Sequence, residues 1–454
     1  MTGIVSLDRQ TQRYLMQTAR LLAAVFLLCA MARAETVKDR EGAVRKDRAT
    51  MASDARWIYN DVARGFAEAQ RTGKPLLVVL RCVPCLACMG IDASVIAEPS
   101  LAPWLDRFVC VRVINANALD LTLFQFDYDL SFSTMFFAAD GTVLGRFGSW
   151  SHQKDARDTT TAGYRAALEA VLALHRDFPG NRSALAGKQG VPTPFKTPVE
   201  IPALAGKYQR ELDWDGKVVQ SCVHCHQIGD AFRASYRAKG ESLPGDLIYP
   251  MPPPETIGLT LAADGVAHVK SVASGSLAAS GGVGLGDDLV SISGQPLVSI
   301  ADVAWALHRA AESGPLAIVV RRGGVEKTLA ISLPVGWRAK ADISRRVGTW
   351  EMRAMALGGL KLEDLADDTR AGRNIPQNAM ALSVNHVGQY GAHALAKNAG
   401  FIKDDVLIEC DGLSNRISES ELIGRLLRTR KPGELVAVAV LRDAARIELS
   451  FPMQ

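Results

Sequence analysis

A run of three cysteines directly after a short apolar segment limits what the first half of the chain can fold into. Residues 76–80 are all Leu or Val, and Cys82-Val-Pro-Cys85-Leu-Ala-Cys88 begins two positions later. A short apolar run that follows a turn residue such as Gly73 is typical of a buried strand. If a helix starts behind the strand, its dipole lowers the pKa of the first thiol and favours redox chemistry.

Residues around this run alternate between helical and extended patterns, which indicates an α/β domain. The predicted elements are a helix over 57–71, strands over 76–80 and 108–114, a hairpin of 135–139 with 142–146 around Asp140-Gly141, and a helix over 162–175. The charged residues 35–55 in front of them are expected to be loose. Cys110 falls inside a predicted strand and is expected to be a core residue.

Residues 57–176 resemble the thioredoxin fold, in particular the exported thioredoxin-like domains that open with Gly-Lys-Pro, here residues 73–75. The resemblance implies a redox pair of Cys85, the nucleophile, and Cys88, which resolves the mixed disulfide. Cys82 is then an auxiliary thiol. A pairing of Cys82 with Cys85 is the competing register.

Two positions depart from the pattern of that family. Ser133 stands where thioredoxins carry a cis-proline, and Val79 stands where they carry a buried acid. Two other interpretations of the cysteine run therefore stay open. Three thiolates suit a soft metal such as Cu(I), and the run is also compatible with a structural disulfide.

A second cysteine motif, Cys222-Val-His-Cys225-His226, has the C-x-x-C-H spacing of a covalent attachment site for c-type haem. Cys222 and Cys225 would form the thioethers, and His226 would be the proximal iron ligand. Met251, held between two prolines, is the candidate distal ligand. The alternatives are a structural disulfide and a zinc site.

The segment that carries this motif, residues 204–254, is shorter than an ordinary cytochrome c domain. A short helix over 228–239 is predicted inside it, and His224 is expected to face solvent. The preceding residues 177–203 are rich in Pro, Gly, Lys and Ser and predict an extended linker.

Residues 1–34 have the features of a signal peptide. Arg13 and Arg20 precede the apolar run 21–31, and Ala32-Arg33-Ala34 supplies a small-x-small cleavage pattern. An uncleaved anchor is the alternative. No later stretch reaches the roughly 20 apolar residues of a membrane span, so a periplasmic protein without a span in the mature chain is expected. Disulfide exchange and haem attachment both suit that compartment.

Residues 255–336 resemble a PDZ domain of the kind attached to bacterial high-temperature-requirement proteases. The residues that carry the resemblance are Ile257-Gly258-Leu259-Thr260, Gly275-Ser276, Gly286-Asp287 and a helix over 300–312. Residues 345–454 form a looser second copy, with Leu357-Gly358-Gly359-Leu360 as the loop and Asp404-Asp405 in place of Gly-Asp. We refer to these copies as the first and second repeats.

The resemblance implies peptide binding by strand addition, with the loop at Ile257, Gly258 and Leu259 holding a C-terminal carboxylate, and 358–360 as its counterpart. Alternatively, the repeats are packing modules whose grooves are filled internally. A Gly-x-Ser-x-Gly serine elbow is missing from the sequence, so proteolysis is not expected.

Together these features predict a multidomain chain: an α/β thioredoxin-like domain, a short haem-binding segment and two small, mainly β PDZ domains. The predicted function is a periplasmic redox protein that combines thiol–disulfide chemistry with haem electron transfer and recruits proteins or peptides, among them a redox partner. A non-catalytic PDZ scaffold and a metal or oxidase assembly factor are the alternatives. A net charge of only +4 and 6% aromatic residues give no basis for nucleic-acid binding.

Overall fold

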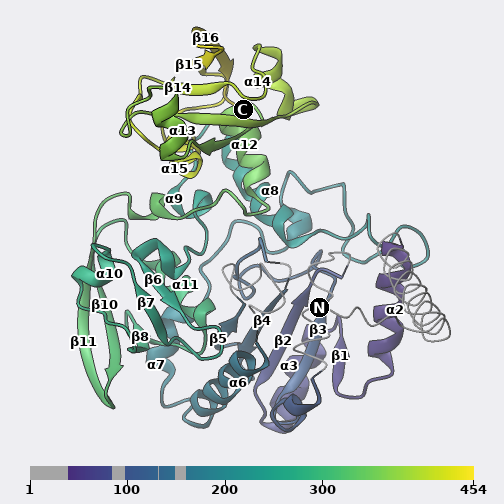
Figure 1. Cartoon of the computed structure of the whole chain (residues 1–454). Helices are drawn as coiled ribbons and strands as arrows, with labels where there is room; N and C mark the ends of the chain where they lie inside the picture. The colour runs from purple at the N-terminus through teal and green to yellow at the C-terminus, as the bar shows by residue number, and fades with distance from the viewer. Residues whose placement is uncertain (1–38, 84–97, 131, 149–159) are drawn as a thin grey trace, which may run out of the picture.

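The computed structural model describes residues 39–83, 98–130, 132–148 and 160–454. Figure 1 shows the first domain at the purple and blue end of the chain, the first repeat beside it and the second repeat at the yellow end. The segment 204–254 runs between the first domain and the repeats. Cys85 and Cys88 lie outside the described residues, as do residues 1–34.

The first domain is built on a five-stranded sheet in the order β1-β3-β2-β4-β5. The strands are β1 (Trp57–Tyr59), β2 (Leu76–Arg81), β3 (Val109–Val113), β4 (Phe132–Phe137) and β5 (Val143–Phe147). β3 is parallel to both β1 and β2, whereas β4 and β5 run antiparallel to their neighbours. The predicted strands and hairpin are therefore present.

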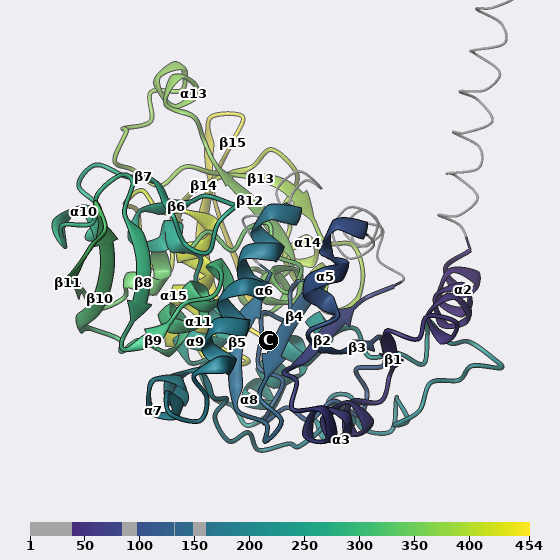
Figure 2. The same ribbon diagram turned by 90° about the horizontal axis from the view of Figure 1, so that it is seen from below.

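Helices cover both faces of this sheet. Because side chains alternate along a strand, Leu77 and Val79 of β2 pack into the cluster beneath α6 (Thr161–Arg176), and Leu76 and Val78 pack into the cluster beneath α3 (Val62–Thr72). Figure 2 shows the strands between these two helices. The short helices η2 (Pro99–Leu101) and α5 (Ala102–Leu105) lead into β3.

Two predictions near the start of this domain were wrong. Residues 57–59 form strand β1 rather than the start of a helix, since Asn60 turns the chain at a φ of 55° and α3 begins only after the Asp61 cap. Residues 40–52 form helix α2 (Arg40–Ala52) rather than a loose segment. Its Asp47 pairs with the buried Arg112 of β3, which holds the helix against the sheet.

The Pro-rich residues 177–203 are folded rather than extended. They contain α7 (Arg182–Leu185), η4 (Ala186–Lys188) and η5 (Pro198–Glu200), and they bury Leu185 and Ile201. The fully buried Lys188 forms an ion pair with Asp302 at 2.5 Å. The Pro-rich composition therefore correctly predicted an interruption of regular structure after α6, but it did not predict that the segment packs against the rest of the protein.

Segment 204–254 carries α8 (Cys225–Ala238) and α9 (Gly245–Ile248), and η6 (Pro254–Ile257) joins it to the first repeat. The helix predicted at 228–239 starts earlier, at Cys225, with His224 as its N-cap. The C-x-x-C-H motif therefore sits at the entrance of a helix.

The two repeats share a core order of two strands, a short helix, a strand, a longer helix and a final strand pair, and each has elements that the other lacks. The first contains β6 (Leu259–Leu261), β7 (Val269–Val272), α10 (Leu277–Ser280), β8 (Asp288–Ile292), β9 (Gln295–Pro296), α11 (Ile300–Arg309), β10 (Gly314–Arg322) and β11 (Val325–Leu333). After η7 (Trp337–Lys340), the second contains α12 (Thr349–Leu357), β12 (Leu360–Asp364), α13 (Asp367–Gly372), β13 (Leu382–Val387), η8 (Gly391–Ala394), α14 (Leu395–Asn398), β14 (Val406–Cys410), α15 (Glu419–Thr429), β15 (Leu435–Arg442) and β16 (Ala445–Pro452).

The first repeat packs on strand β5 through α11. The backbone N–H of Arg146 donates to Asp302 Oδ1 at 3.1 Å, and the indole N–H of Trp305 donates to the carbonyl of Gly187 at 2.9 Å. A Cβ on Gly145 would come within 2.2 Å of Val298 Cγ2, so the close approach requires glycine there. The first domain and first repeat thus share a tight interface.

Candidate functional site

The carboxyl end of β2 carries the described part of the cysteine run. Cys82 follows Arg81, the last residue of β2, and is half-buried. The parallel neighbour β3 ends at Val113, and Ile114 follows it at the same edge of the sheet. A segment that packs against this edge of the sheet is therefore in contact with Cys82.

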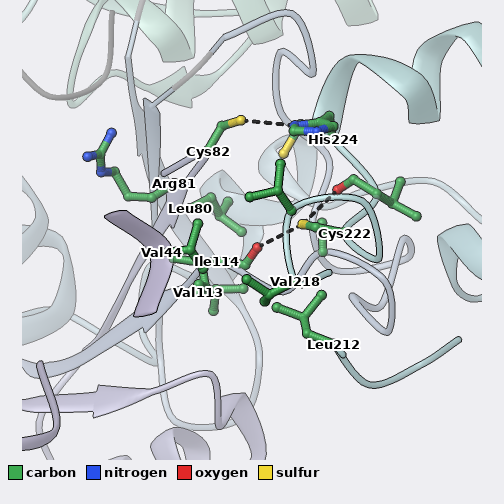
Figure 3. A pocket seen from close by; sticks show the side chains of 14 residues that line it. Val44, Leu80, Arg81, Cys82, Val113, Ile114, Leu212, Val218, Cys222 and His224 are labelled. Atoms are coloured by element: carbon green, nitrogen blue, oxygen red, sulfur yellow. Dashed lines mark hydrogen bonds between the residues drawn. The ribbon is translucent and has the colours of Figure 1, made fainter. Parts of the chain in front are cut away.

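The C-x-x-C-H motif occupies this position, so the structure brings the two cysteine motifs together. Cys82 Sγ lies 3.2 Å from His224 Nδ1, a hydrogen-bond distance. The two residues, with Cys222 and Cys225, line one cavity of about 20 Å³. Figure 3 shows the side chains of Cys82 and His224 pointing toward each other and the thiol of Cys222 turned toward Ile114.

Hydrogen bonds to the first domain hold the motif in place. Cys222 Sγ donates to the carbonyl of Ile114 at 3.4 Å. The fully buried Asn117 donates to the carbonyls of Gln209 and Ser221, at 2.7 and 2.8 Å, and accepts from the N–H of Val223 at 2.7 Å. One side chain thus fixes the backbone on both sides of Cys222.

Helix α2 holds the same segment from the other side. Arg45 donates to the carbonyls of Trp214 and Gly216, at 3.2 and 2.6 Å, and Glu41 accepts from the N–H of Val219 at 3.1 Å. Segment 204–254 is therefore docked on the first domain by contacts from two separate parts of the chain.

Burial sets the protonation of the thiols and imidazoles at this site. It raises the pKa of the Cys222 thiol to about 11 and raises the pKa of Cys225 further, with nearby Cys82 and Cys222 adding to the effect on Cys225. Burial also lowers the pKa values of His224 and His226, whose rings stack at 5.8 Å. Both shifts favour the neutral imidazole, whose unprotonated ring nitrogen can accept a hydrogen bond from the Cys82 thiol.

The structure also shows the surroundings of three other residues that the sequence singled out, Cys110, Ser133 and His224. Cys110 is buried in the core, as predicted, and burial raises the pKa of its thiol to about 12. Ser133 is buried in β4, with its hydroxyl donating to the carbonyl of Phe147 at 3.4 Å. His224, expected in solvent, is instead half-buried against Cys82.

Met251 is not brought together with Cys222, Cys225 and His226. It lines a different cavity, also of about 20 Å³, with Ser133 and Arg146. Its backbone has a φ of 45°, and its N–H points to His308 Nδ1 at 3.5 Å.

The arrangement of Cys222 and Cys225 does not fit a haem. A cavity of about 20 Å³ holds one water, whereas sites for larger organic ligands measure roughly 300 Å³ or more. Both thiols face this small space against the first domain. Covalent haem stays a prediction from the motif, and it requires the segment to be arranged differently.

Within the described ranges, no group of three or more His, Cys, Asp or Glu side chains is placed to hold a metal ion. A copper site formed by the whole cysteine run would involve Cys85 and Cys88, which are outside those ranges. Nor does any helix in the described part of the chain have the length and apolar character needed to cross a membrane.

The loops predicted to bind peptides differ between the repeats. In the first, Ile257 and Leu259 are buried, and Gly258 has a φ of 88°. In the second, Glu419 of α15 accepts from the N–H of Leu362 in β12 at 2.7 Å, and Arg353 of α12 holds this carboxylate at 2.9 Å. In the second repeat this N–H of the edge strand β12 therefore already has a hydrogen-bond partner within the chain.

The sequence alone does not indicate that the two cysteine motifs meet, nor what His224 and Asn117 contact there. The only signal was a pair of asparagines, Asn115 and Asn117, just beyond a predicted strand. Nothing in the sequence indicates that their partners lie about 100 positions away, which is a property of the tertiary fold.

Comparison with known families identifies the first domain. A family model described as thioredoxin-like matches residues 57–139. The chain therefore contains a thioredoxin-like domain, which suggests a thiol–disulfide redox function. No curated protein matches the chain.

Solved structures of an HtrA-type protease, AlgW, are similar to part of the chain. The complex with a decapeptide is 17% identical over 29% of this chain and 38% of that chain, with a TM-score of 0.20. The complex with a tripeptide is 15% identical over 29% and 40%, with a TM-score of 0.19. The chain thus spans about two fifths of these proteins, and TM-scores of this size do not establish a common fold.

Proposed function

We propose that this chain is a periplasmic thiol–disulfide exchange protein that recruits its protein partners through the first repeat. The observation that carries the proposal is a thioredoxin-like domain whose strand β2 ends directly before a run of cysteines. An exported chain would meet disulfides in an oxidising compartment.

In the proposed reaction, the Cys85 thiolate attacks a substrate disulfide and Cys88 releases the product by attacking the mixed disulfide. The described residues supply the surroundings of this chemistry. Val79 offers no carboxylate in β2, and the His224 imidazole is in contact with Cys82. Proton transfer therefore differs from that in thioredoxins with a buried acid.

Reduction of insulin disulfides by dithiothreitol tests this proposal. The wild-type chain should accelerate the reaction, and Cys85→Ser and Cys88→Ser should lose the acceleration. Cys410→Ala is the matched control, because Cys410 is buried in the second repeat. Equal rates for wild type and both active-site variants would favour the non-catalytic scaffold instead.

Peptide recruitment is proposed for the first repeat alone. The position equivalent to Glu419, directly after the serine cap of the helix, is Ile300 in α11, which cannot hold the strand edge through a carboxylate. Peptides with free and amidated C-termini should bind differently if the loop at 257–259 holds a carboxylate. Equal binding of both forms would contradict this role.

Haem electron transfer remains the second candidate, on the strength of the C-x-x-C-H motif. A spectrum of the protein exported from cells that carry the haem-attachment machinery decides it. A Soret band together with the haem mass on the 222–226 peptide would establish haem. A spectrum without that band would leave thiol exchange as the function.

A further inference from the structure

The cavity between the first domain and segment 204–254 contains more thiol chemistry than a thioredoxin-like site uses. Cys82, Cys222 and Cys225 all line it, and they come from two segments far apart in the sequence. Thioredoxin-like exchange by Cys85 and Cys88 requires neither Cys222 nor Cys225. Their burial against Cys82 therefore needs an explanation of its own.

We propose that Cys82, Cys222 and Cys225 form a second thiol–disulfide exchange site, in which Cys222 and Cys225 take up a disulfide and Cys82 exchanges with it. The site lies entirely in described residues.

The spacing and position of Cys222 and Cys225 suit a redox pair. They form a C-x-x-C unit, with Cys225 as the first residue of the 14-residue helix α8. Cys82, Cys222 and Cys225 line the same cavity, and the charges that Cys82 and Cys222 would carry raise the pKa of the Cys225 thiol. The shared cavity therefore places Cys82 beside the Cys222–Cys225 pair.

Docking of the segment is specific rather than incidental. The buried Asn117 makes two hydrogen bonds to the backbone that flanks Cys222 and a third to Gln209, and α2 makes three more to the segment through Arg45 and Glu41. These contacts keep the pair at the end of β2, where Cys82 is. Preorganisation of this kind raises the effective concentration of one thiol at the other.

The exchange step balances without an outside electron carrier once the disulfide is present. A low-molecular-weight or protein disulfide first oxidises Cys222 and Cys225 to their disulfide. His224 Nδ1 takes the proton of Cys82, and the thiolate attacks Sγ of Cys225. The Cys222–Cys225 bond breaks, and its electron pair and a proton go to Cys222. One disulfide and one thiol are present before and after.

Disulfide mapping of the full mature chain tests the site. The protein is treated with oxidised glutathione, quenched with acid, alkylated and digested for mass spectrometry. In Cys222→Ser, oxidised glutathione forms a mixed disulfide on Cys225, and Cys82 attacks the Cys225 sulfur and releases glutathione. The Cys222 thiol that would reverse the exchange is missing, so a peptide pair linked through Cys82 and Cys225 should accumulate above its wild-type level. Cys225→Ser should lose that linked pair completely, and the Cys410→Ala control should keep the wild-type pattern.

Glutathione on Cys82 and Cys225 separately, with no link between them in Cys222→Ser, would overturn the proposal. So would thioether-bound haem on Cys222 and Cys225 of the wild type. The wild-type chain reports the same link in smaller amount, so the test survives a failure of the variant to fold. Loss of insulin reduction in Cys85→Ser, without a Cys82–Cys225 link, would sink this site and leave the proposed function standing.

Discussion

At the scale of single residues, buried polar side chains decide where the functional groups lie. Asn117 is fully buried, and its amide joins the backbone at Gln209, Ser221 and Val223 to the first domain. A buried backbone group that loses its partner costs about 1–3 kcal/mol. The position of Cys222 therefore depends on a residue outside both cysteine motifs.

We expect Asn117→Ala to lower the free energy of unfolding by about 2 kcal/mol, because it leaves several buried backbone groups unpaired. It should also lower the yield of the Cys82–Cys225 link. Urea denaturation and disulfide mapping measure the two effects. Asn385→Ala, which removes an exposed hydrogen bond to Glu363 in the second repeat, is the control. Equal losses in both variants would contradict the role of Asn117.

Asp230 gives a prediction for pH. Its pKa is raised to about 7, mainly by burial; the nearby Asp129 and Glu351 contribute to the rise, and Arg233 opposes it. The folded state therefore holds a proton that the unfolded state releases above about pH 4, so this group reduces stability as pH rises from 4 to 7. Asp230→Asn should remove that loss.

Denaturation midpoints at pH 5 and pH 8 measure the effect. The stability advantage of the variant over wild type should be larger at pH 8 than at pH 5 by about 1–3 kcal/mol. Asp215→Asn, at an exposed site, should show no such difference. A variant that is less stable than wild type at pH 8 would show that the ion pair with Arg233 outweighs the cost of burial.

At the scale of elements, the two repeats show which local features are shared. Asp287 pairs with Arg322 in the first, and Asp405 pairs with Arg442 in the second. In each, the arginine also donates to a glycine carbonyl, at Gly282 and Gly400. The sequence resemblance between the repeats therefore corresponds to a repeated ion pair that joins a loop to a long hairpin.

The repeats differ at the edge strand. Glu419 accepts from Leu362 in β12 and is paired with Arg353, and all three are buried. Removing one partner of a buried ion pair costs about 3–5 kcal/mol, because the other charge stays buried. Glu419→Gln should therefore destabilise the chain by an amount of that order.

Thermal or urea unfolding measures this loss, with Glu421→Gln as the control on the same helix. Glu421 lies at the helix cap and pairs with the exposed Lys340, and exposed pairs are worth at most about 1 kcal/mol. A cost for Glu419→Gln no larger than that of the control would show that the edge strand β12 is not held by this carboxylate.

The sequence predicted most elements because they have strong local signals. The continuous apolar run 76–80 and the Asp140-Gly141 turn predicted strands β2, β4 and β5, and these are present. Helix α2 and the folded 177–203 segment were missed, since distant partners stabilise them: Arg112 for α2 and Asp302 for Lys188. Each cysteine motif was recognised by its local spacing. The contact between the two motifs was not, because it depends on the tertiary fold.

At the scale of the whole molecule, buried ion pairs join the parts of the chain. Arg346, which precedes the second repeat, pairs with Asp127 and Asp129 of the first domain. All three side chains are buried, so the contact tolerates no unpaired charge.

We expect Arg346→Met to separate the second repeat from the first domain, since two buried carboxylates would then lack their cation. Limited proteolysis should cut the chain between the first and second repeats faster in this variant. Arg345→Met, at an exposed neighbouring position, should be cut at the wild-type rate. Identical cleavage of both variants would show that the pairing with Asp127 and Asp129 does not hold the parts together.

The contact between Cys82 and His224 joins positions 142 residues apart in the chain. A disulfide between Cys82 and Cys225, the residue that follows His224, would close a loop of nearly the same length. Closing a loop of that length removes about 5 kcal/mol of conformational entropy from the unfolded chain. The melting temperature would then report whether the Cys82–Cys225 disulfide has formed, because the cross-linked protein would be harder to unfold.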